Sequence, residues 1–237
     1  MSLYRKTDEL KKEDFFIFES KKEDFPYYKK FKLPPIVWVF LTFFWGLIFA
    51  NSFFGDIFLI IFTIFFGLLL GILFPIWDYQ QVFKKIKKQD IILIMVILLL
   101  SISYVSIMSY LINILGFAGG RYYTVDDLTL MFWISFPFAM LFEELFKIFL
   151  FLATLSVSYK ISKNRKKSIY ISVIINCFCF ALIHYYTYLN IVSIFLLQGV
   201  GNVFFMFAYI KTKNIWVTYI IHVLYNLFFF GRLMLGI

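Results

Sequence analysis

Long apolar runs separated by short charged segments constrain the fold of this chain more than any other feature. Hydrophobic residues make up 62% of its 237 residues, and aromatic residues make up 23%. A helix needs about 20 such residues to cross roughly 30 Å of hydrocarbon. Segments that approach this length are 35–54, 57–77, 91–115, 128–159, 168–188, 191–210 and 215–230. The sequence therefore predicts an all-α, polytopic membrane bundle with about seven transmembrane helices.

The positions of Lys and Arg between these runs predict how the chain is oriented. The arm 1–33 and the segments 84–90, 160–167 and 211–213 are basic, whereas the alternate connections carry little Lys or Arg. Basic connections stay in the cytoplasm, so we expect a cytoplasmic N-terminus and an extracytoplasmic C-terminus. The net charge of +9 is explained by this topology, and no nucleic-acid partner is expected.

Three regions follow from this pattern. Residues 1–33 lack the apolar core and cleavage site of a signal peptide and predict a basic, amphipathic arm on the cytoplasmic leaflet of the bilayer. Residues 34–127 hold the N-terminal transmembrane helices, and residues 128–237 hold the apolar segments with buried polar groups. Abundant Phe, Ile, Lys, Tyr and Asn indicate an AT-rich genome, so we expect the cell membrane of a bacterium.

Two adjacent carboxylates and an ammonium, Glu143, Glu144 and Lys147, lie in the middle of one apolar run. A charge at the centre of a span costs at least about 2.5–3.5 kcal/mol, so such groups face a protein interior or a water-filled cavity. Lys147 is within reach of either carboxylate along a helix. Adjacent residues on a helix point about 100° apart, and an ion pair needs only one carboxylate. The second carboxylate must therefore have another partner, which leaves it for function. A buried ion pair that only fixes helix packing is the alternative.

The two histidines of the chain lie in later apolar runs. His184 follows Phe180 by four residues, and His222 precedes Asn226 by four, so each pair shares a helix face. At about 1.5 Å per residue, these groups and Glu143 reach depths that allow one shared cavity. The Asn226 amide could fix the His222 tautomer or donate to an oxyanion. Taken singly, each histidine is as typical of packing as of a site.

This set of side chains suits hydrolysis. A desolvated carboxylate can act as a general base toward water, an imidazole can hold that water, and His with Asn can stabilise a tetrahedral oxyanion. Glu143, His184 and His222 could equally bind Zn²⁺ with an open position for water. The residues alone do not separate the two mechanisms.

These motifs resemble the CPBP (Abi) intramembrane proteases, which include type II CAAX prenyl endopeptidases and bacteriocin-processing or immunity proteins. The family's signatures are a Glu-Glu-x-x-x-Arg helix, a Phe-x-x-x-His helix and a His-x-x-x-Asn helix. In this chain they are matched in order by Glu143-Glu144, by Phe180 and His184, and by His222 and Asn226. The likeness covers about Met131 to Phe230, whereas the first three spans match only as membrane helices.

The resemblance implies roles for these residues. Glu143 and His184 would activate the hydrolytic water, Glu144 would assist, and His222 with Asn226 would form the oxyanion site. It also implies that residues 128–237 form the catalytic core, that the glutamate mechanism needs no metal, and that no cofactor is expected.

One position departs from the family pattern. The family's Arg falls at Ile148, whereas this chain carries Lys147 one residue earlier. Glu-Glu-x-x-Lys is similar to a related family that cleaves anti-sigma factors, but that family has Glu where this chain has His184. The shift turns the cation by about 100° around the helix, and Lys lacks the bidentate fork of Arg.

We therefore expect an intramembrane endopeptidase that cleaves a prenylated, lipidated or leader-bearing peptide in the lipid bilayer. A non-proteolytic bacteriocin immunity or membrane scaffold protein of the same family is the alternative. An ion-coupled transporter with a carboxylate proton relay is a third reading, which the lack of an internal sequence repeat disfavours.

Overall fold

The computed structural model describes residues 24–26, 79–117, 124–185 and 189–236, and all regular structure within these ranges is helical. The predicted spans 35–54 and 57–77 and nearly all of the arm 1–33 lie outside the described residues. The elements, in chain order, are η3 (Tyr79–Gln81), α3 (Lys88–Ile114), η4 (Val125–Asp127), α4 (Leu130–Ser162), α5 (Arg165–Ile183), α7 (Ile191–Ser193), η5 (Ile194–Val200), α8 (Asn202–Thr212) and α9 (Ile215–Leu235).

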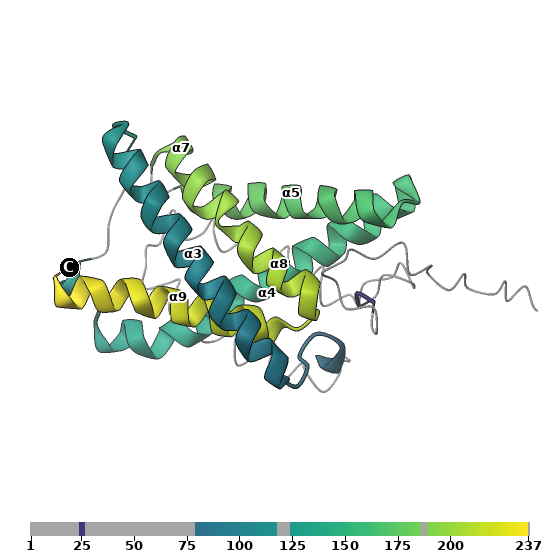
Figure 1. Ribbon diagram of the computed structural model, residues 1–237, viewed down its shortest axis with the longest axis horizontal. Coiled ribbons are helices and arrows are strands. Elements are labelled where there is room, and N and C mark those ends of the chain that lie inside the picture. The colour runs from purple at the N-terminus through teal and green to yellow at the C-terminus, as the bar shows by residue number, and fades with distance from the viewer. Residues whose placement is uncertain (1–23, 27–78, 118–123, 186–188, 237) are drawn as a thin grey trace, which may run out of the picture.

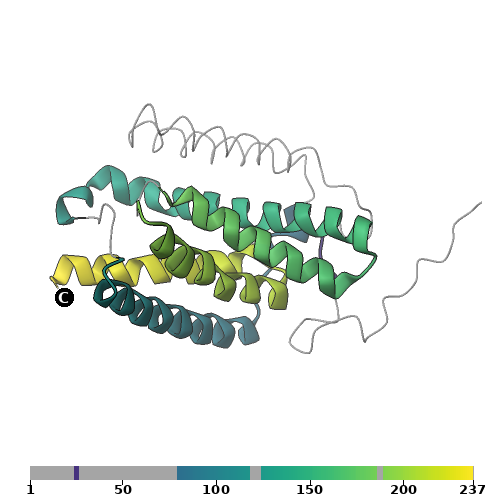
Figure 2. The ribbon, with the colours of Figure 1, turned by 90° about the horizontal axis from the view of Figure 1, so that it is seen from above.

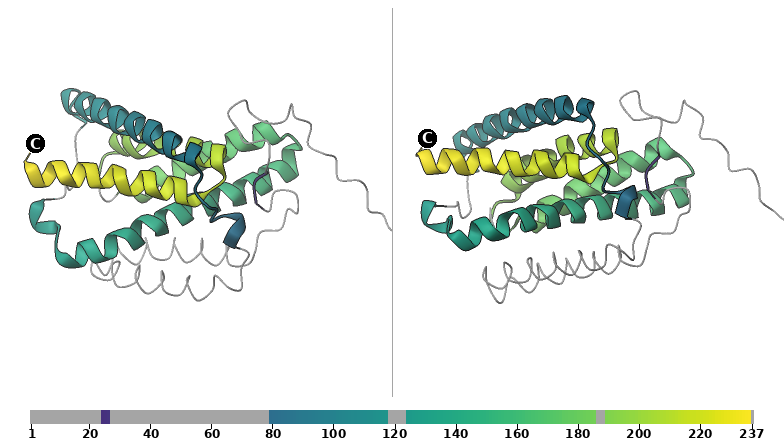
Figure 3. Two further views of the ribbon diagram at one scale, coloured as in Figure 1. Left: turned by 60° about the horizontal axis from the view of Figure 1, so that its bottom comes forward. Right: turned by 90° about the horizontal axis from the view of Figure 1, so that it is seen from below.

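The helices form a bundle in which α9 lies between α3 and α4 (Figure 3). Helix α8 packs against α9 and α3, and α5 packs along α4 and against η5 (Figures 1 and 2). Helices α4, α5, α8 and α9 therefore surround a common interior, to which the predicted site residues of α4, α5 and α9 contribute.

Two Lys-Asn dipeptides make the tight turns of this bundle. Lys163 and Lys213 both have a φ of 52°, the left-handed conformation that ends a helix. The next residues, Asn164 and Asn214, each accept a hydrogen bond from a backbone N–H in the first turn of the following helix. The same two-residue device thus joins α4 to α5 and α8 to α9. Two-residue turns keep the joined helices antiparallel and in contact.

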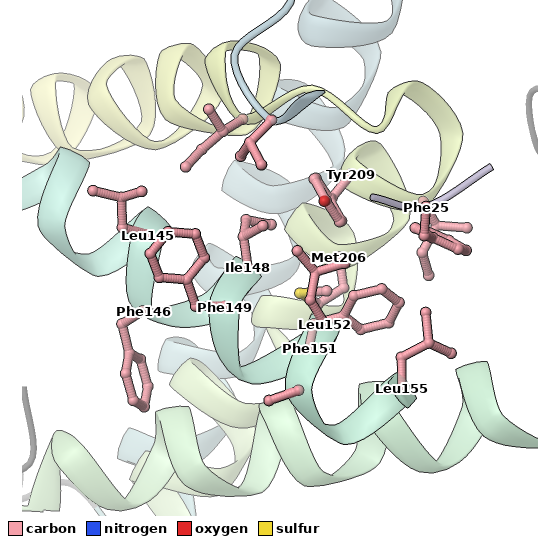
Figure 4. Packing of buried hydrophobic residues seen from close by; sticks show 14 of the residues in the cluster. Phe25, Leu145, Phe146, Ile148, Phe149, Phe151, Leu152, Leu155, Met206 and Tyr209 are labelled. Carbon is pink, nitrogen blue, oxygen red and sulfur yellow. The ribbon is translucent and has the colours of Figure 1, made fainter. Parts of the chain in front are cut away.

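Helix α4 supplies most of the hydrophobic core. Its buried side chains include Leu145, Phe149 and Leu152, which pack with Met206 and Tyr209 of α8 (Figure 4). On α3, by contrast, many apolar side chains point outward. A surface of exposed aliphatic side chains is costly in water, but it suits contact with lipid.

Four helical segments of the described part are long and apolar enough to cross a membrane: Lys88–Ile114, Arg165–Ile183, Ile191–Thr212 and Ile215–Leu235. They correspond to predicted spans with ends that differ by a few residues. The predicted span 128–159 coincides with α4, which carries the charged residues and is not among the four. A membrane helical bundle is therefore consistent with the fold, whereas the number of seven spans is not established.

Candidate active site

Helix α4 places Glu144 and Lys147 deep in the bundle, where their side chains form an ion pair and are each only 1% exposed. The sequence allowed Lys147 to pair with either carboxylate, and the structure selects Glu144. The Lys147 Nζ also lies over two aromatic rings, 4.8 Å from the centre of Phe180 and 4.5 Å from that of Phe205. The ammonium is thus held by one carboxylate and two ring faces.

His222 of α9 lies between the two carboxylates of α4. Its Nδ1 is 2.7 Å from Oε1 of Glu144, and its Nε2 is 3.8 Å from Oε2 of Glu143. The edge-to-face contact with Phe205, at 5.3 Å between ring centres, supports the imidazole from the side. A carboxylate paired with Lys147 can only accept a hydrogen bond. Glu144 therefore favours the His222 tautomer whose Nδ1 carries the proton.

The two carboxylates differ in their environment. The Glu143 side chain is 26% exposed, whereas that of Glu144 is 1% exposed. Glu144 is therefore built into the interior, and Glu143 is the carboxylate that a substrate or a water molecule can reach.

The Asn226 amide bonds to the backbone of His222 rather than to its ring, so its proposed role in fixing the imidazole tautomer gains no support from this bond. Its Nδ2 donates to the backbone carbonyl of His222 at 3.2 Å and lies 3.1 Å from the Met140 Sδ. The reason is geometric: i and i+4 side chains share a helix face, but the Asn amide is short and reaches the carbonyl one turn back. A thioether is a weak acceptor, so this amide keeps a donor that a stronger acceptor can recruit.

His184 directly follows the last residue of α5, and its ring is half-buried. Its Nδ1 lies 2.8 Å from the backbone carbonyl of Phe180, and the two rings are 4.6 Å apart. Because a carbonyl only accepts, Nδ1 donates this hydrogen bond, and Nε2 of the neutral ring is left as an acceptor. The Phe180 ring contacts both the His184 ring and the Lys147 ammonium, which pairs with Glu144. The fold thus connects His184 to the group of charged residues on α4 through one aromatic ring.

Among the described residues, no three His, Cys, Asp or Glu side chains are arranged to hold a metal ion. The set proposed for zinc, Glu143, His184 and His222, does not form such a group. In this arrangement the Nδ1 of His222 faces Glu144, and the Nδ1 of His184 faces a backbone carbonyl.

Residues 125–228 match the family model of type II CAAX prenyl endopeptidases, described as Rce1-like. The match begins just before α4 and includes every candidate residue named above. This part of the chain is similar to Rce1-like domains and is called the Rce1-like domain below. The CPBP resemblance is thereby confirmed, and with it the general class, a CAAX-type protease of the membrane. No curated protein and no solved structure matches the chain.

Two buried amides of the Rce1-like domain were missed by sequence reasoning. Asn176 of α5 donates from its Nδ2 to the backbone carbonyl of Lys147, and Asn202 of α8 donates to the Asn176 Oδ1 at 2.9 Å. Both side chains are at most 2% exposed. A signal was present, since each Asn interrupts an apolar run, but a lone amide in a span is also common in helix packing.

Proposed function

We propose that the Rce1-like domain is an intramembrane endopeptidase in which Glu143 is the general base and His222 is its partner. Support comes mainly from one observation: the His222 imidazole lies between a buried, ion-paired carboxylate and a reachable one. An imidazole held by a buried carboxylate on one nitrogen and directed at a reactive group with the other is a recurring arrangement in hydrolases.

The hydrolytic water would bind between Glu143 and His222. With its proton on the Nδ1 that lies 2.7 Å from Glu144, the neutral His222 ring offers the lone pair of Nε2. The Glu143 Oε2, 3.8 Å away, is a second acceptor. A water molecule beside this gap donates one hydrogen to each, which leaves an oxygen lone pair directed away from both residues and toward a peptide carbonyl.

In the reaction, Glu143 removes a proton from this water as the oxygen attacks the carbonyl carbon. The carbonyl electrons move to oxygen and form a tetrahedral oxyanion. When that intermediate collapses, the C–N bond breaks, and the proton held by Glu143 goes to the leaving nitrogen. The products are a new carboxylic acid, which ionises in water, and a new amine.

Asn226 and His184 complete the proposed site. The Asn226 Nδ2, now against the weak Met140 acceptor, would turn to the oxyanion, a much stronger acceptor. The Nε2 of His184 is also an acceptor in the tautomer set by Phe180, and it is the alternative to His222 as the acceptor of the water's second hydrogen. Lys147 and Phe180 are supporting residues, because they hold Glu144 and the His184 ring.

The substrate we propose is a prenylated, lipidated or leader-bearing peptide that reaches Glu143 from the bilayer. The N-terminus would be cytoplasmic, the C-terminus extracytoplasmic and the source bacterial. No cofactor is required. Elemental analysis of the purified protein tests this last point, because stoichiometric zinc would overturn the glutamate mechanism.

The decisive experiment uses the full-length protein in lipid vesicles with fluorescence-quenched prenylated and unprenylated peptides. We expect Glu143→Gln to lower the cleavage rate by at least about 100-fold, the contribution of a general base, with unchanged substrate binding. Asp126→Asn, which neutralises an exposed carboxylate in η4, is the matched control and should cleave normally. If Glu143→Gln cleaves at the wild-type rate, the proposed mechanism is wrong.

A comparison of membrane peptidomes extends the test to unknown substrates. Cells carrying wild-type protein and cells carrying Glu143→Gln at equal abundance should differ in at least one peptide product. Identical peptidomes, under conditions where deletion has a phenotype, would favour the non-proteolytic immunity or scaffold reading.

A further inference from the structure

A small cavity lies beside Lys147 and His222. Its volume is about 20 Å³, and Glu143, Glu144 and His184 are not among its lining residues. A water molecule needs about 10–15 Å³ of such volume and two to four polar partners. The lining residues with a polar group in the side chain are Ser101, Lys147, Gln198, Asn202, His222 and Tyr225. The cavity therefore has the size and the chemistry for a single bound water.

Asn202 carries a buried acceptor beside this cavity. Asn176 has to donate to a carbonyl, so its own Oδ1 accepts from the Asn202 amide group, and the orientation of both amides is fixed. The Oδ1 of Asn202 is then left buried without a hydrogen-bond partner in the described part of the chain. An acceptor left in this way costs about 1–3 kcal/mol, which a water donating to it would recover.

Lys147 supplies the matching donor. An ammonium has three N–H bonds, and one of them is directed at the Glu144 carboxylate. The rings of Phe180 and Phe205 stabilise its charge but are weaker partners than an oxygen. A water that accepts from Lys147 and donates to Asn202 would satisfy both groups at once.

The backbone next to the cavity is adapted to this arrangement. Segment η5 is a π-helix, a wide turn that is rare and is often found at functional sites. It carries Gln198, which lines the cavity together with Asn202 just beyond its end. The Leu196 carbonyl within it accepts a hydrogen bond from the Tyr104 hydroxyl of α3 at 2.9 Å. The wide turn is therefore stabilised from outside.

We infer that this cavity binds one structural water and that Asn202 is a positioning residue for the proposed protease. Through the water, Asn202 holds the Lys147 ammonium against Glu144, and Glu144 in turn holds the Nδ1 proton of His222. The polar chain thus runs from α8 through the cavity to α4 and on to α9. The role of Asn202 in catalysis rests on the proposed function. The binding of the water and the tautomer of His222 can be tested whether or not the protein is a protease.

The water is tested first, in the wild-type protein in detergent. X-ray radiolysis converts bound water to hydroxyl radicals, which oxidise neighbouring side chains that bulk solvent does not reach. We expect oxidation at Phe205 and Phe180, which line the cavity, and none at Phe149, which is also buried but does not line it. Equal absence of oxidation at all three rings would overturn the bound water.

The positioning role is tested by nitrogen NMR of labelled histidine, because the chain has only two histidines. The wild-type protein should show a His222 signal with its proton on Nδ1. In Asn202→Leu we expect this signal to shift toward a mixture of tautomers, while the His184 signal stays unchanged and serves as the internal control. Asn202→Ser, which keeps an acceptor oxygen, should retain most of the wild-type signal. A wild-type His222 signal in folded Asn202→Leu would overturn the positioning role.

Activity gives a separate readout. Asn202→Leu should lower kcat by up to about 100-fold, the effect of a misplaced catalytic group, with little change in KM. A variant with a shifted His222 signal but a wild-type kcat would confirm that Asn202 positions His222. The same result would contradict the proposed catalytic role of His222.

Discussion

Two buried ion pairs in this molecule look alike but lie in different settings. In the candidate site, Glu144 pairs with Lys147, whose ammonium lies over two aromatic rings. In the other ion pair, the Arg165 guanidinium lies 3.0 Å from the Asp24 carboxylate, and its Cζ is 5.3 Å from the centre of the Phe25 ring. We call the second arrangement the N-terminal latch, formed by Asp24 and Phe25 docked on Arg165.

The latch is a packing device. Phe25 is 3% exposed and makes an edge-to-face contact with Phe151 at 5.3 Å, near Tyr209 (Figure 4). A second cation also lies near the Phe25 ring, since the Nζ of Lys213, on the α8–α9 turn, is 5.0 Å from its centre. The aromatic side chain supplies the buried area, and the charges fix its orientation.

The candidate site differs in having more ionisable groups than an ion pair requires. A single pair would need one carboxylate, yet a second carboxylate and an imidazole lie within 3.8 Å of each other beside it. Such a surplus is costly in an apolar interior, and it is what the proposed proton transfer would require. The comparison teaches that an excess of titratable groups, rather than the burial of charge, distinguishes the candidate site from a structural ion pair such as the N-terminal latch.

The largest loss of stability is expected for Lys147→Met. This variant leaves the Glu144 carboxylate buried without its cation, and breaking a buried pair in this way costs about 3–5 kcal/mol. The measurement is the free energy of unfolding in detergent. The double variant Glu144→Gln with Lys147→Met should recover most of the loss, because no unpaired charge remains. A double variant as unstable as the single one would show that packing rather than charge is responsible.

Phe25→Ala comes next. Removing a buried phenylalanine side chain costs about 3 kcal/mol or more, and the expected readout is a lower unfolding temperature with unchanged kcat in the folded fraction. Phe178→Ala, at a ring that is 51% exposed, is the control and should have little effect. A drop in kcat for Phe25→Ala would make the latch part of the catalytic machinery and would remove the contrast drawn above.

The two regions also differ in how far the sequence predicts them. Glu143, Glu144 and the histidines stand out because polar residues in apolar runs are costly, and three helices carry them in positions that their spacing makes compatible. The latch leaves no such signal, because Asp24 and Arg165 are 141 residues apart and both lie in charged segments. Only the packing of the folded chain brings them together.

Within the site, side-chain contacts between helices were also beyond prediction. The spacing along α4 left Lys147 two possible partners, and the crossing of α4 and α9 decided that Glu144 faces His222. The π-helix η5 was missed because a wide turn has no distinct periodicity over seven residues. The helical runs were predicted well for the opposite reason, since an apolar run of that length has few other structures available to it.

Arg165→Met should cost less than either variant above. A hydrogen bond to a charged group contributes about 1.5–3 kcal/mol, but the Asp24 side chain is 11% exposed and water can reach it once the guanidinium is gone. We expect a loss of about 2 kcal/mol in the free energy of unfolding. Arg232→Met, on an exposed side chain near the end of α9, controls for the loss of a positive charge. A loss of unfolding free energy as large as that of Lys147→Met would mean that water does not reach the Asp24 carboxylate in the variant.

The smallest effect on stability is expected where the effect on cleavage is largest. Glu143 is partly exposed, and the only ion-pair partner described for it is His222 at 3.8 Å, too far for a strong hydrogen bond. Glu143→Gln should therefore change the free energy of unfolding by no more than about 0.5 kcal/mol, the range of partly exposed positions. A small effect on stability beside a large effect on cleavage would match the proposed role of Glu143 as the general base. If Glu143→Gln instead unfolds as readily as Lys147→Met, both carboxylates belong to the framework, and the base has to be sought at His184.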